Sequence, residues 1–183
     1  MSGQRTTSMR RGGGAALIAA LALGGVAMAT TSVAANDGAA DAWAVLKDGN
    51  GDTVGFALFT EDAAGAMNVN VHVRAMAPGR HGIHVHAVGN CESAGFTSAG
   101  SHHNPSGALH GQHAGDLPNL VVNRSRHGHL NTKLARFTLA DGPTAVLGGD
   151  GSALVVHASA DDYVTDPTGN SGARIACGVI NGA

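Results

Sequence analysis

The sequence predicts an all-β domain, and three properties of the chain lead to that prediction. Glycine is abundant, at 28 of 183 residues, whereas charged residues make up 13% and aromatic residues 3%. This composition favours tight turns between short strands over long charged helices. About eight short apolar or alternating stretches lie between turn residues, and none has the period of an amphipathic helix. We therefore expect an eight-stranded Greek-key flattened barrel, an immunoglobulin-like sandwich, with two long functional loops.

The expected strands follow one another with turn residues between them. Residues 42–46 and 53–60 flank Lys47-Asp-Gly-Asn-Gly51, which is typical of a hairpin. Residues 67–75 alternate apolar and polar side chains, so His72 falls on the polar face and is not expected to be a ligand. The remaining strands are expected at residues 81–88, 119–122, 132–139, 145–147, 153–157 and 175–180.

The N-terminus predicts an export signal in residues 1–35, followed by one domain in residues 36–183. Arginines precede an apolar stretch at residues 15–29 that is too short and too rich in small residues for a membrane span. Cleavage is expected after Ala29 or Ala35. The pair Arg10-Arg11 leaves the twin-arginine route as an alternative, although the glycines that follow match it poorly. We expect a periplasmic or otherwise exported protein, with no stable membrane span in the mature chain.

The charge balance argues against a nucleic-acid partner. The formal net charge is −2 with histidine neutral, which provides no basic surface for neutralising phosphates. One basic cluster, residues 124–129, is interpreted as a solvated hairpin tip around Gly128. Steering of a substrate or binding to an anionic surface remain alternatives for this cluster.

Histidines are the candidate functional residues. His84 and His86 lie two positions apart in an expected strand, so both imidazoles point to one side of the sheet. Imidazole suits copper and zinc better than calcium or magnesium. Residues 89–118 form a long stretch without apolar periodicity that contains four histidines, a cysteine and Asp116. We expect this loop to be ordered by metal binding, and residues 161–174 to form a second functional loop.

These residues resemble a known family, the copper,zinc superoxide dismutases, and most closely its exported bacterial branch. The resemblance covers nearly the whole mature chain. Its motifs are His84-Val-His86, Gly100-Ser-His-His-Asn-Pro105, His110-Gly, His113-Ala-Gly-Asp116-Leu-Pro-Asn, Leu154-Val-Val-His157 with Ala160-Asp-Asp162, and Gly169-Asn-Ser-Gly-Ala-Arg174-Ile-Ala-Cys177-Gly-Val-Ile.

The resemblance implies one copper and one zinc ion per subunit. The implied copper ligands are His84, His86, His102 and His157. The implied zinc ligands are His102, His110, His113 and Asp116. His102 would bridge the two ions, and Asp161 would link a copper-side histidine to a zinc-side histidine. His103 is not expected to be a ligand, and His81 is expected to have a structural role.

The implied activity is conversion of superoxide to dioxygen and hydrogen peroxide in two half-reactions at the copper. His102 would be both ligand and proton donor, and Arg174 would attract the anion, with Thr168 narrowing the channel. The second loop contains no lysine, so the source of any further steering stays open. An antioxidant role in an exported compartment follows, and the resemblance is compatible with a homodimer or a monomer.

The two cysteines, Cys91 and Cys177, are expected to pair, because an exported protein meets an oxidising environment. The resemblance implies the same intrasubunit disulfide. Two free thiols are the less favoured alternative.

Two other functions are compatible with a histidine-rich chain. A non-enzymatic copper carrier on the same fold would lack the bridge, the zinc set or the arginine, yet all of these positions are filled here. A histidine-rich module that scavenges metal or binds anions explains the histidines, but not Asp116, Arg174 or the cysteine pair.

Overall fold

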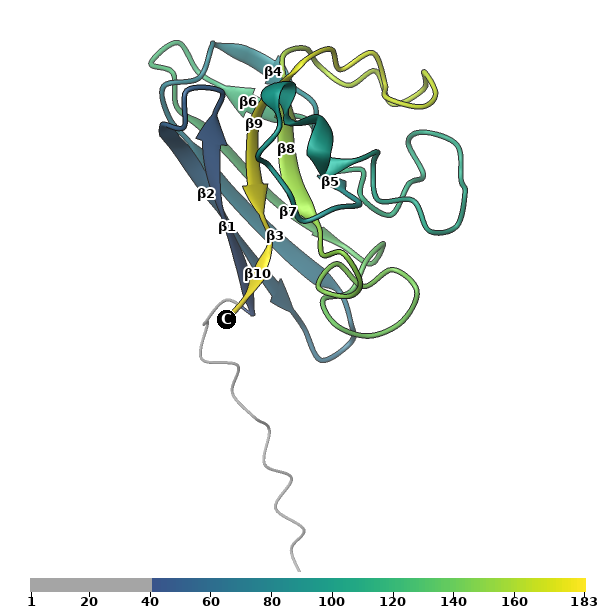
Figure 1. Ribbon diagram of the computed structural model, residues 1–183. Coiled ribbons are helices and arrows are strands. Elements are labelled where there is room, and N and C mark those ends of the chain that lie inside the picture. The colour runs from purple at the N-terminus through teal and green to yellow at the C-terminus, as the bar shows by residue number, and fades with distance from the viewer. Residues whose placement is uncertain (1–40) are drawn as a thin grey trace, which may run out of the picture. The chain divides into compact units, whose positions relative to one another are not determined.

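The computed structural model describes residues 41–183, which form an all-β domain. Its ten strands are β1 (Ala42–Asp48), β2 (Thr53–Glu61), β3 (Met67–Val73), β4 (Gly79–His81), β5 (Ile83–His86), β6 (Leu120–Val122), β7 (Gly128–Leu134), β8 (Ala153–His157), β9 (Arg174–Val179) and β10 (Asn181–Gly182). One short 3-10 helix, η1 (Ala94–Ala99), interrupts the loop after β5 (Figure 1). No helix in this range is both long and apolar enough to cross a membrane. The predicted signal peptide and cleavage sites lie outside the described residues.

The strands form a nearly closed antiparallel barrel. Their order is β4-β6-β7-β3-β2-β1-β9-β8-β5, and β10 pairs with β1. β4 and β5 are two parts of one segment interrupted at Gly82, and they pair with β6 and β8 at the two ends of this order. β9 and β10 likewise both pair with β1. Counted as continuous segments, the strands therefore number eight, as predicted, and the connection from β3 to β4 skips β7 and β6 as in a Greek key.

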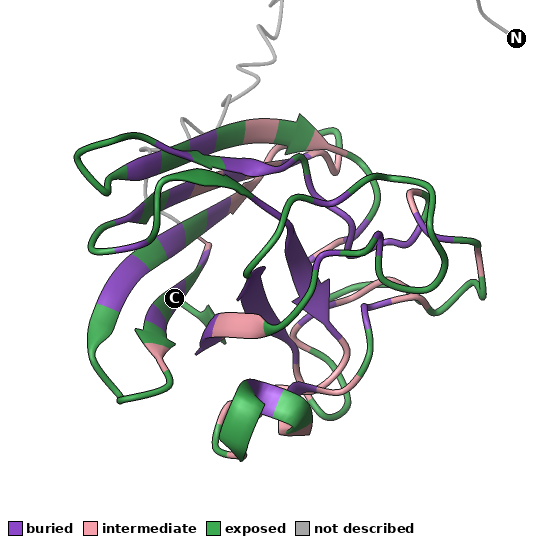
Figure 2. Ribbon diagram, turned by 90° about the horizontal axis from the view of Figure 1, so that it is seen from above, coloured by how far each residue is buried: buried purple, intermediate pink, exposed green. Residues whose placement is uncertain are grey.

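Alternation of apolar and polar residues builds the core. In β1, residues Ala42, Ala44 and Leu46 are fully buried while the residues between them are exposed. The same alternation runs along β2 and β3, and Figure 2 shows it as alternating buried and exposed bands. β5 and β8 are instead buried along their whole lengths, because loops cover their outer faces. Three histidines that the sequence marks as candidate ligands, His84, His86 and His157, lie on those two strands.

Three strand predictions need correction. β7 spans Gly128–Leu134 rather than residues 132–139, so Gly128 lies in a strand and the exposed tip is at residues 123–127. A Cβ at Gly128 would lie 2.8 Å from a methyl of Val73, so this close approach of strands requires glycine. Residues 145–147 form no strand. These residues instead belong to an irregular segment. Its Val146 is buried in the core in the same cluster as Phe137 and Leu139.

The third correction concerns residues 81–88, which were predicted as one strand. The ladder is interrupted at Gly82, where a Cβ would lie 2.8 Å from Oγ of Ser171. The backbone of Gly82 instead donates to Ser159 O and accepts from His157 N, at 2.8 Å each. This break moves the chain from the β6 edge to the β8 edge and allows the barrel to close.

Candidate metal centre

The predicted ligand residues come from two strands and one loop. His84 and His86 lie on β5, His157 ends β8, and residues 102–116 belong to the loop after η1. Backbone bridges join this loop to β5, pairing His86 with His102 and His84 with Asp116. The strands therefore provide a rigid platform onto which the long loop is folded.

Two groups of four buried side chains could each hold an ion, and the ligand atoms within each group all lie within 4.8 Å of one another. The first group is His84, His86, His102 and His157, and the second is His102, His110, His113 and Asp116. His102 is the one member that the two groups share. These are the two sets that the sequence resemblance implied, and the structure brings all seven side chains together.

Backbone carbonyls fix the orientation of two histidines in the first group. Nδ1 of His86 lies 2.9 Å from Gly100 O, and Nδ1 of His157 lies 3.2 Å from Gly172 O. A carbonyl only accepts, so each Nδ1 carries the proton and each Nε2 has a free lone pair. These two Nε2 atoms lie 3.4 Å apart. A cation bound by both would relieve the repulsion between the lone pairs.

Three buried ring nitrogens have no hydrogen-bond partner in the described part of the chain. They are Nδ1 of His84, Nε2 of His102 and Nδ1 of His110. Leaving a buried polar atom unpaired costs about 1–3 kcal/mol. Because one such atom lies on the shared His102 and one on each side of it, the donor set fits two metal ions. The fourth unpaired side-chain atom, Oδ1 of Asn70, belongs to neither group.

The protonation states also suit metal binding. Burial lowers the pKa of His86 to about 2, and burial with the neighbouring His84 lowers the pKa of His157 to about 3. Burial likewise lowers the pKa of His102. Burial opposes ionisation of Asp116, but its hydrogen bond with His102 and the nearby histidines lower its pKa overall. Burial therefore favours the neutral form of His86, His102 and His157, and Asp116 is a carboxylate, which are the forms that bind metals.

Asp161 links the two groups. Its Oδ2 lies 2.8 Å from Nε2 of His84 and its Oδ1 lies 2.8 Å from Nε2 of His110. Burial raises the pKa of Asp161, but these two hydrogen bonds outweigh that effect and lower it to about 2. The carboxylate thus fixes both rings with their Nδ1 atoms directed away from it, toward the two groups.

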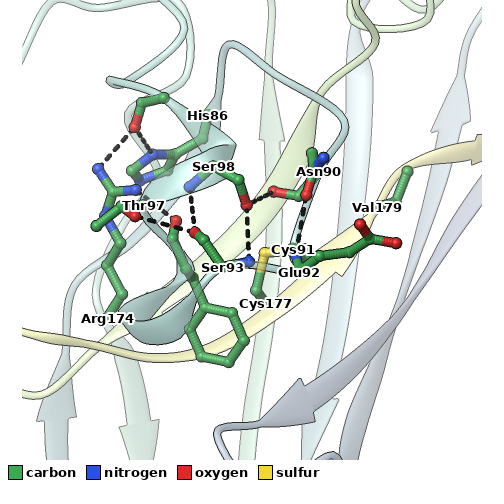
Figure 3. The surroundings of a disulfide bond; sticks show 12 residues. His86, Asn90, Cys91, Glu92, Ser93, Thr97, Ser98, Arg174, Cys177 and Val179 are labelled. Atoms are coloured by element: carbon green, nitrogen blue, oxygen red, sulfur yellow. Dashed lines mark hydrogen bonds between the residues drawn. A yellow bond between two sulfur atoms is a disulfide. The ribbon is translucent and has the colours of Figure 1, made fainter.

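Arg174 lies beside the first group. It lines a cavity of about 410 Å³ together with His86, His102, His157 and Thr168. Its guanidinium donates to Phe96 O and Gly100 O at 2.6 Å each, and Gly100 O also accepts from His86 (Figure 3). The guanidinium is thereby held at the mouth of the histidine cluster.

A disulfide ties the arginine's strand to the loop that holds it. Cys91, in the loop before η1, is bonded to Cys177 on β9, as predicted (Figure 3). Cys177 packs with Phe96 and Ala99 of η1 in a small second core cluster. The disulfide therefore keeps the carbonyls of Phe96 and Gly100 close to Arg174.

Comparison with known proteins identifies the family. A family model described as copper/zinc superoxide dismutase matches residues 53–180. The chain belongs to the copper/zinc superoxide dismutase family. The predicted family, and with it the predicted class of oxidoreductase, is confirmed. Membership of this family implies copper and zinc, which agrees with the histidine clusters of the structure.

The relatives are bacterial and similar over most of their length. The Cu-Zn superoxide dismutase of Caulobacter vibrioides is 37% identical over 148 residues, 76% of this chain and 84% of that protein. The Cu-Zn superoxide dismutase of Deinococcus radiodurans is 37% identical over 153 residues, 74% of this chain and 81% of that protein. A crystal structure of a SOD-like protein from Bacillus subtilis matches with a TM-score of 0.71 and 35% identity, covering 75% of this chain and 96% of that chain.

Asn119 also contributes to the site, although the sequence predicts no role for it. The side chain of Asn119 accepts from Asp161 N at 2.8 Å and donates to Asp161 O at 2.9 Å. It also donates to Oη of Tyr163 at 2.8 Å. Asn119 thereby holds the backbone of Asp161 in place. Its position in the Asp-Leu-Pro-Asn motif was visible, but its partner 42 residues away was not.

The two remaining buried histidines, His81 and His103, contact backbone carbonyls outside the two metal groups. Both ring nitrogens of His81 face backbone carbonyls, those of His157 at 2.7 Å and Ala77 at 2.9 Å. Nε2 of His103 lies 3.1 Å from Thr144 O. Neither belongs to a metal group. His81 therefore connects the β4 end to β8, and His103 connects the metal loop to the segment after β7.

Proposed function

We propose that this protein is a superoxide dismutase that converts superoxide to dioxygen and hydrogen peroxide, using one copper and one zinc ion per chain. The observation that carries the proposal is that His102 belongs to both four-residue groups and has a buried ring nitrogen with no hydrogen-bond partner among residues 41–183. An imidazole shared in this way is suited to bridge two cations, which together stabilise its deprotonated form.

The composition of each group assigns the metals. Three histidines and one carboxylate suit a closed tetrahedral zinc site, so His102, His110, His113 and Asp116 bind the zinc. The all-imidazole group beside the cavity suits copper, so His84, His86, His102 and His157 bind the copper. Copper, when bound, supplies one-electron redox chemistry.

The residues of the chain select the substrate and handle its protons. Arg174 carries a permanent positive charge in the cavity and attracts and orients the superoxide anion. Thr168 lines the same cavity and restricts its width. With the ions bound, His102 would hold one proton at Nε2 in one half of the cycle and donate it toward the peroxide product in the other, and solvent would supply the second proton.

The experiment that tests this proposal is superoxide dismutation by the chain from Asn36, loaded with copper and zinc, compared with Arg174→Ala and Arg174→Lys. We expect fast copper-dependent turnover that falls about 10- to 100-fold in Arg174→Ala, because the local anion concentration is lost. Arg174→Lys should be intermediate and should keep a dependence on ionic strength that Arg174→Ala loses.

Two results would count against this proposal. If the wild type binds both ions but shows no dismutation, the protein is a copper carrier on the same fold. If Arg174→Ala has wild-type activity at equal copper content, the arginine does not guide the substrate. Metal analysis of each variant separates a steering defect from a loss of copper.

Asp161→Asn is expected to weaken binding of both ions about 10- to 100-fold. A neutral amide has one acceptor oxygen, so it cannot accept from His84 and His110 together as the carboxylate does. Competition with a chelator measures the two affinities. Asp162→Asn is the matched control, because its carboxylate bonds to Thr165 and Asn170 in the loop. Unchanged affinities in Asp161→Asn would show that the link does not position the rings.

We further propose that the protein is exported and acts as an antioxidant defence in that compartment. The Cys91–Cys177 disulfide supports this location, since disulfides persist in oxidising compartments. The signal-like residues 1–35 support it as well. The mass of the protein recovered from the producing cell would locate the cleavage, with loss of residues 1–29 or 1–35 expected.

Monomer and homodimer remain alternatives, which sedimentation of the mature chain distinguishes.

A further inference from the structure

Two exposed histidines face each other on the outside of the barrel. His72 on β3 and His129 on β7 are direct cross-strand partners. Their ring centroids are 4.5 Å apart and their planes are tilted by 30°. Both side chains point away from the core, in which Val71, Val73 and Leu130 are buried. They are therefore separate from the seven buried side chains of the metal centre.

The histidine pair is the middle of a row that crosses five strands. Phe56 on β2 pairs with His72 and its ring is stacked on it at 5.1 Å, and Val45 on β1 pairs with Phe56. On the other side, Val121 on β6 pairs with His129. The two imidazoles therefore stand between apolar side chains on the exposed face of the sheet.

A cavity of about 730 Å³ opens over this row. Its lining includes both histidines, together with Phe56, Arg74 and His127. No carboxylate belongs to the lining. A hard ion such as calcium or magnesium, which requires oxygen ligands, would find no charged ligand there. Imidazole nitrogen is a ligand for borderline transition metals, and copper(II) is bound most strongly among the divalent ions.

We propose that His72 and His129 form a second, surface site that chelates a divalent transition-metal ion of the copper(II) class. The antiparallel ladder from Val69–Thr132 to Val73–Gly128 fixes the two backbones, so only the side-chain torsions remain to be set. Two nitrogens bound to one ion at about 2.0–2.1 Å lie about 3 Å apart. The ring centroids of the tilted pair are 4.5 Å apart, so rotation of the two side chains can bring one nitrogen of each ring to the same ion. Water completes the coordination, and the cation Arg74 in the same cavity limits the affinity.

This proposal gives a role to two features that the sequence analysis set aside. His72 was expected to be a non-ligand, and it is one with respect to the buried centre. His129 was assigned to a polar tip, whereas it lies in β7, directly across from His72. The pairing register, which the sequence does not reveal, is what makes the two side chains neighbours.

The test is to titrate copper(II) into the copper- and zinc-loaded protein and count bound copper after removal of free ion. We expect one more equivalent of copper in the wild type than in His72→Gln or His129→Gln. Electron paramagnetic resonance of that equivalent should show coupling to imidazole nitrogen. Dismutation should be equal in all of these proteins. Asn131→Gln is the matched control, because Asn131 is exposed on the same strand and face.

The surface site is measured as the difference in bound copper between the wild type and the histidine variants. Copper in the buried centre contributes equally to all of these proteins and cancels. The proposal is wrong if the wild type and both histidine variants bind the same amount of copper. It is also wrong if Asn131→Gln loses the additional equivalent, because the effect would then belong to the strand and not to the imidazoles. In either case the two imidazoles form only a cross-strand contact of the sheet.

Discussion

His102→Gln is expected to lower copper-dependent dismutation by at least about a hundredfold and to release zinc. Mutating a residue that hydrogen-bonds to a metal ligand typically lowers metal affinity or activity by about 10- to 100-fold. Loss of a ligand that both ions share should have a larger effect. Glutamine keeps a polar group at the position but cannot present two opposed nitrogens. The measurement is the dismutation rate per bound copper, with copper and zinc counted in the same sample.

The matched control is His103→Gln. His103 is the next residue along the chain and is also buried, but its Nε2 faces Thr144 O and it belongs to neither group. We expect His103→Gln to keep both metals and most of the activity. If His102→Gln bound both ions and turned over at the wild-type rate, the bridge would not exist.

Cys91→Ser is expected to lower the free energy of unfolding by about 4–5 kcal/mol. The disulfide closes a loop between positions 86 residues apart, and the chain-entropy model gives a gain of this size for such a loop. Urea denaturation of the oxidised wild type and of the variant measures the difference. Reduced wild type is the control, and it should unfold as the variant does.

The same substitution should also lower activity. Without the bond, the segment that carries Phe96 O and Gly100 O is no longer tied to β9, and Arg174 loses its fixed acceptors. A stability change of less than about 1 kcal/mol would show that packing of η1 against β9 holds the loop without the disulfide.

Strands with one buried face were predictable from the sequence. The alternation in residues 67–73 fixed which side chains enter the core, and the turn at residues 47–51 located the first hairpin. The i, i+2 spacing of His84 and His86 on a strand also placed both side chains in one buried group. Patterns of this kind depend only on residues close in sequence, so they can be recognised without knowing the tertiary structure.

Long-range pairing was not predictable. Residues 135–139 and 145–147 were predicted to be in strands, yet they form an irregular segment. Phe137, Leu139 and Val146 are nevertheless buried in the core, because apolar side chains can be buried without strand pairing. Likewise, the carbonyls of Gly100 and Gly172 that orient His86 and His157 belong to the backbone, where residue type carries no signal. The approach of His72 to His129 depends on strand register in the same way.

If His102 bridges a copper and a zinc ion, anomalous X-ray diffraction at the two metal absorption edges should locate one ion on each side of its ring. Crystals of the metal-loaded protein should show one copper peak among His84, His86, His102 and His157. They should show one zinc peak among His102, His110, His113 and Asp116. A single peak, or two peaks of which one does not contact His102, would show that His102 does not bridge the two ions.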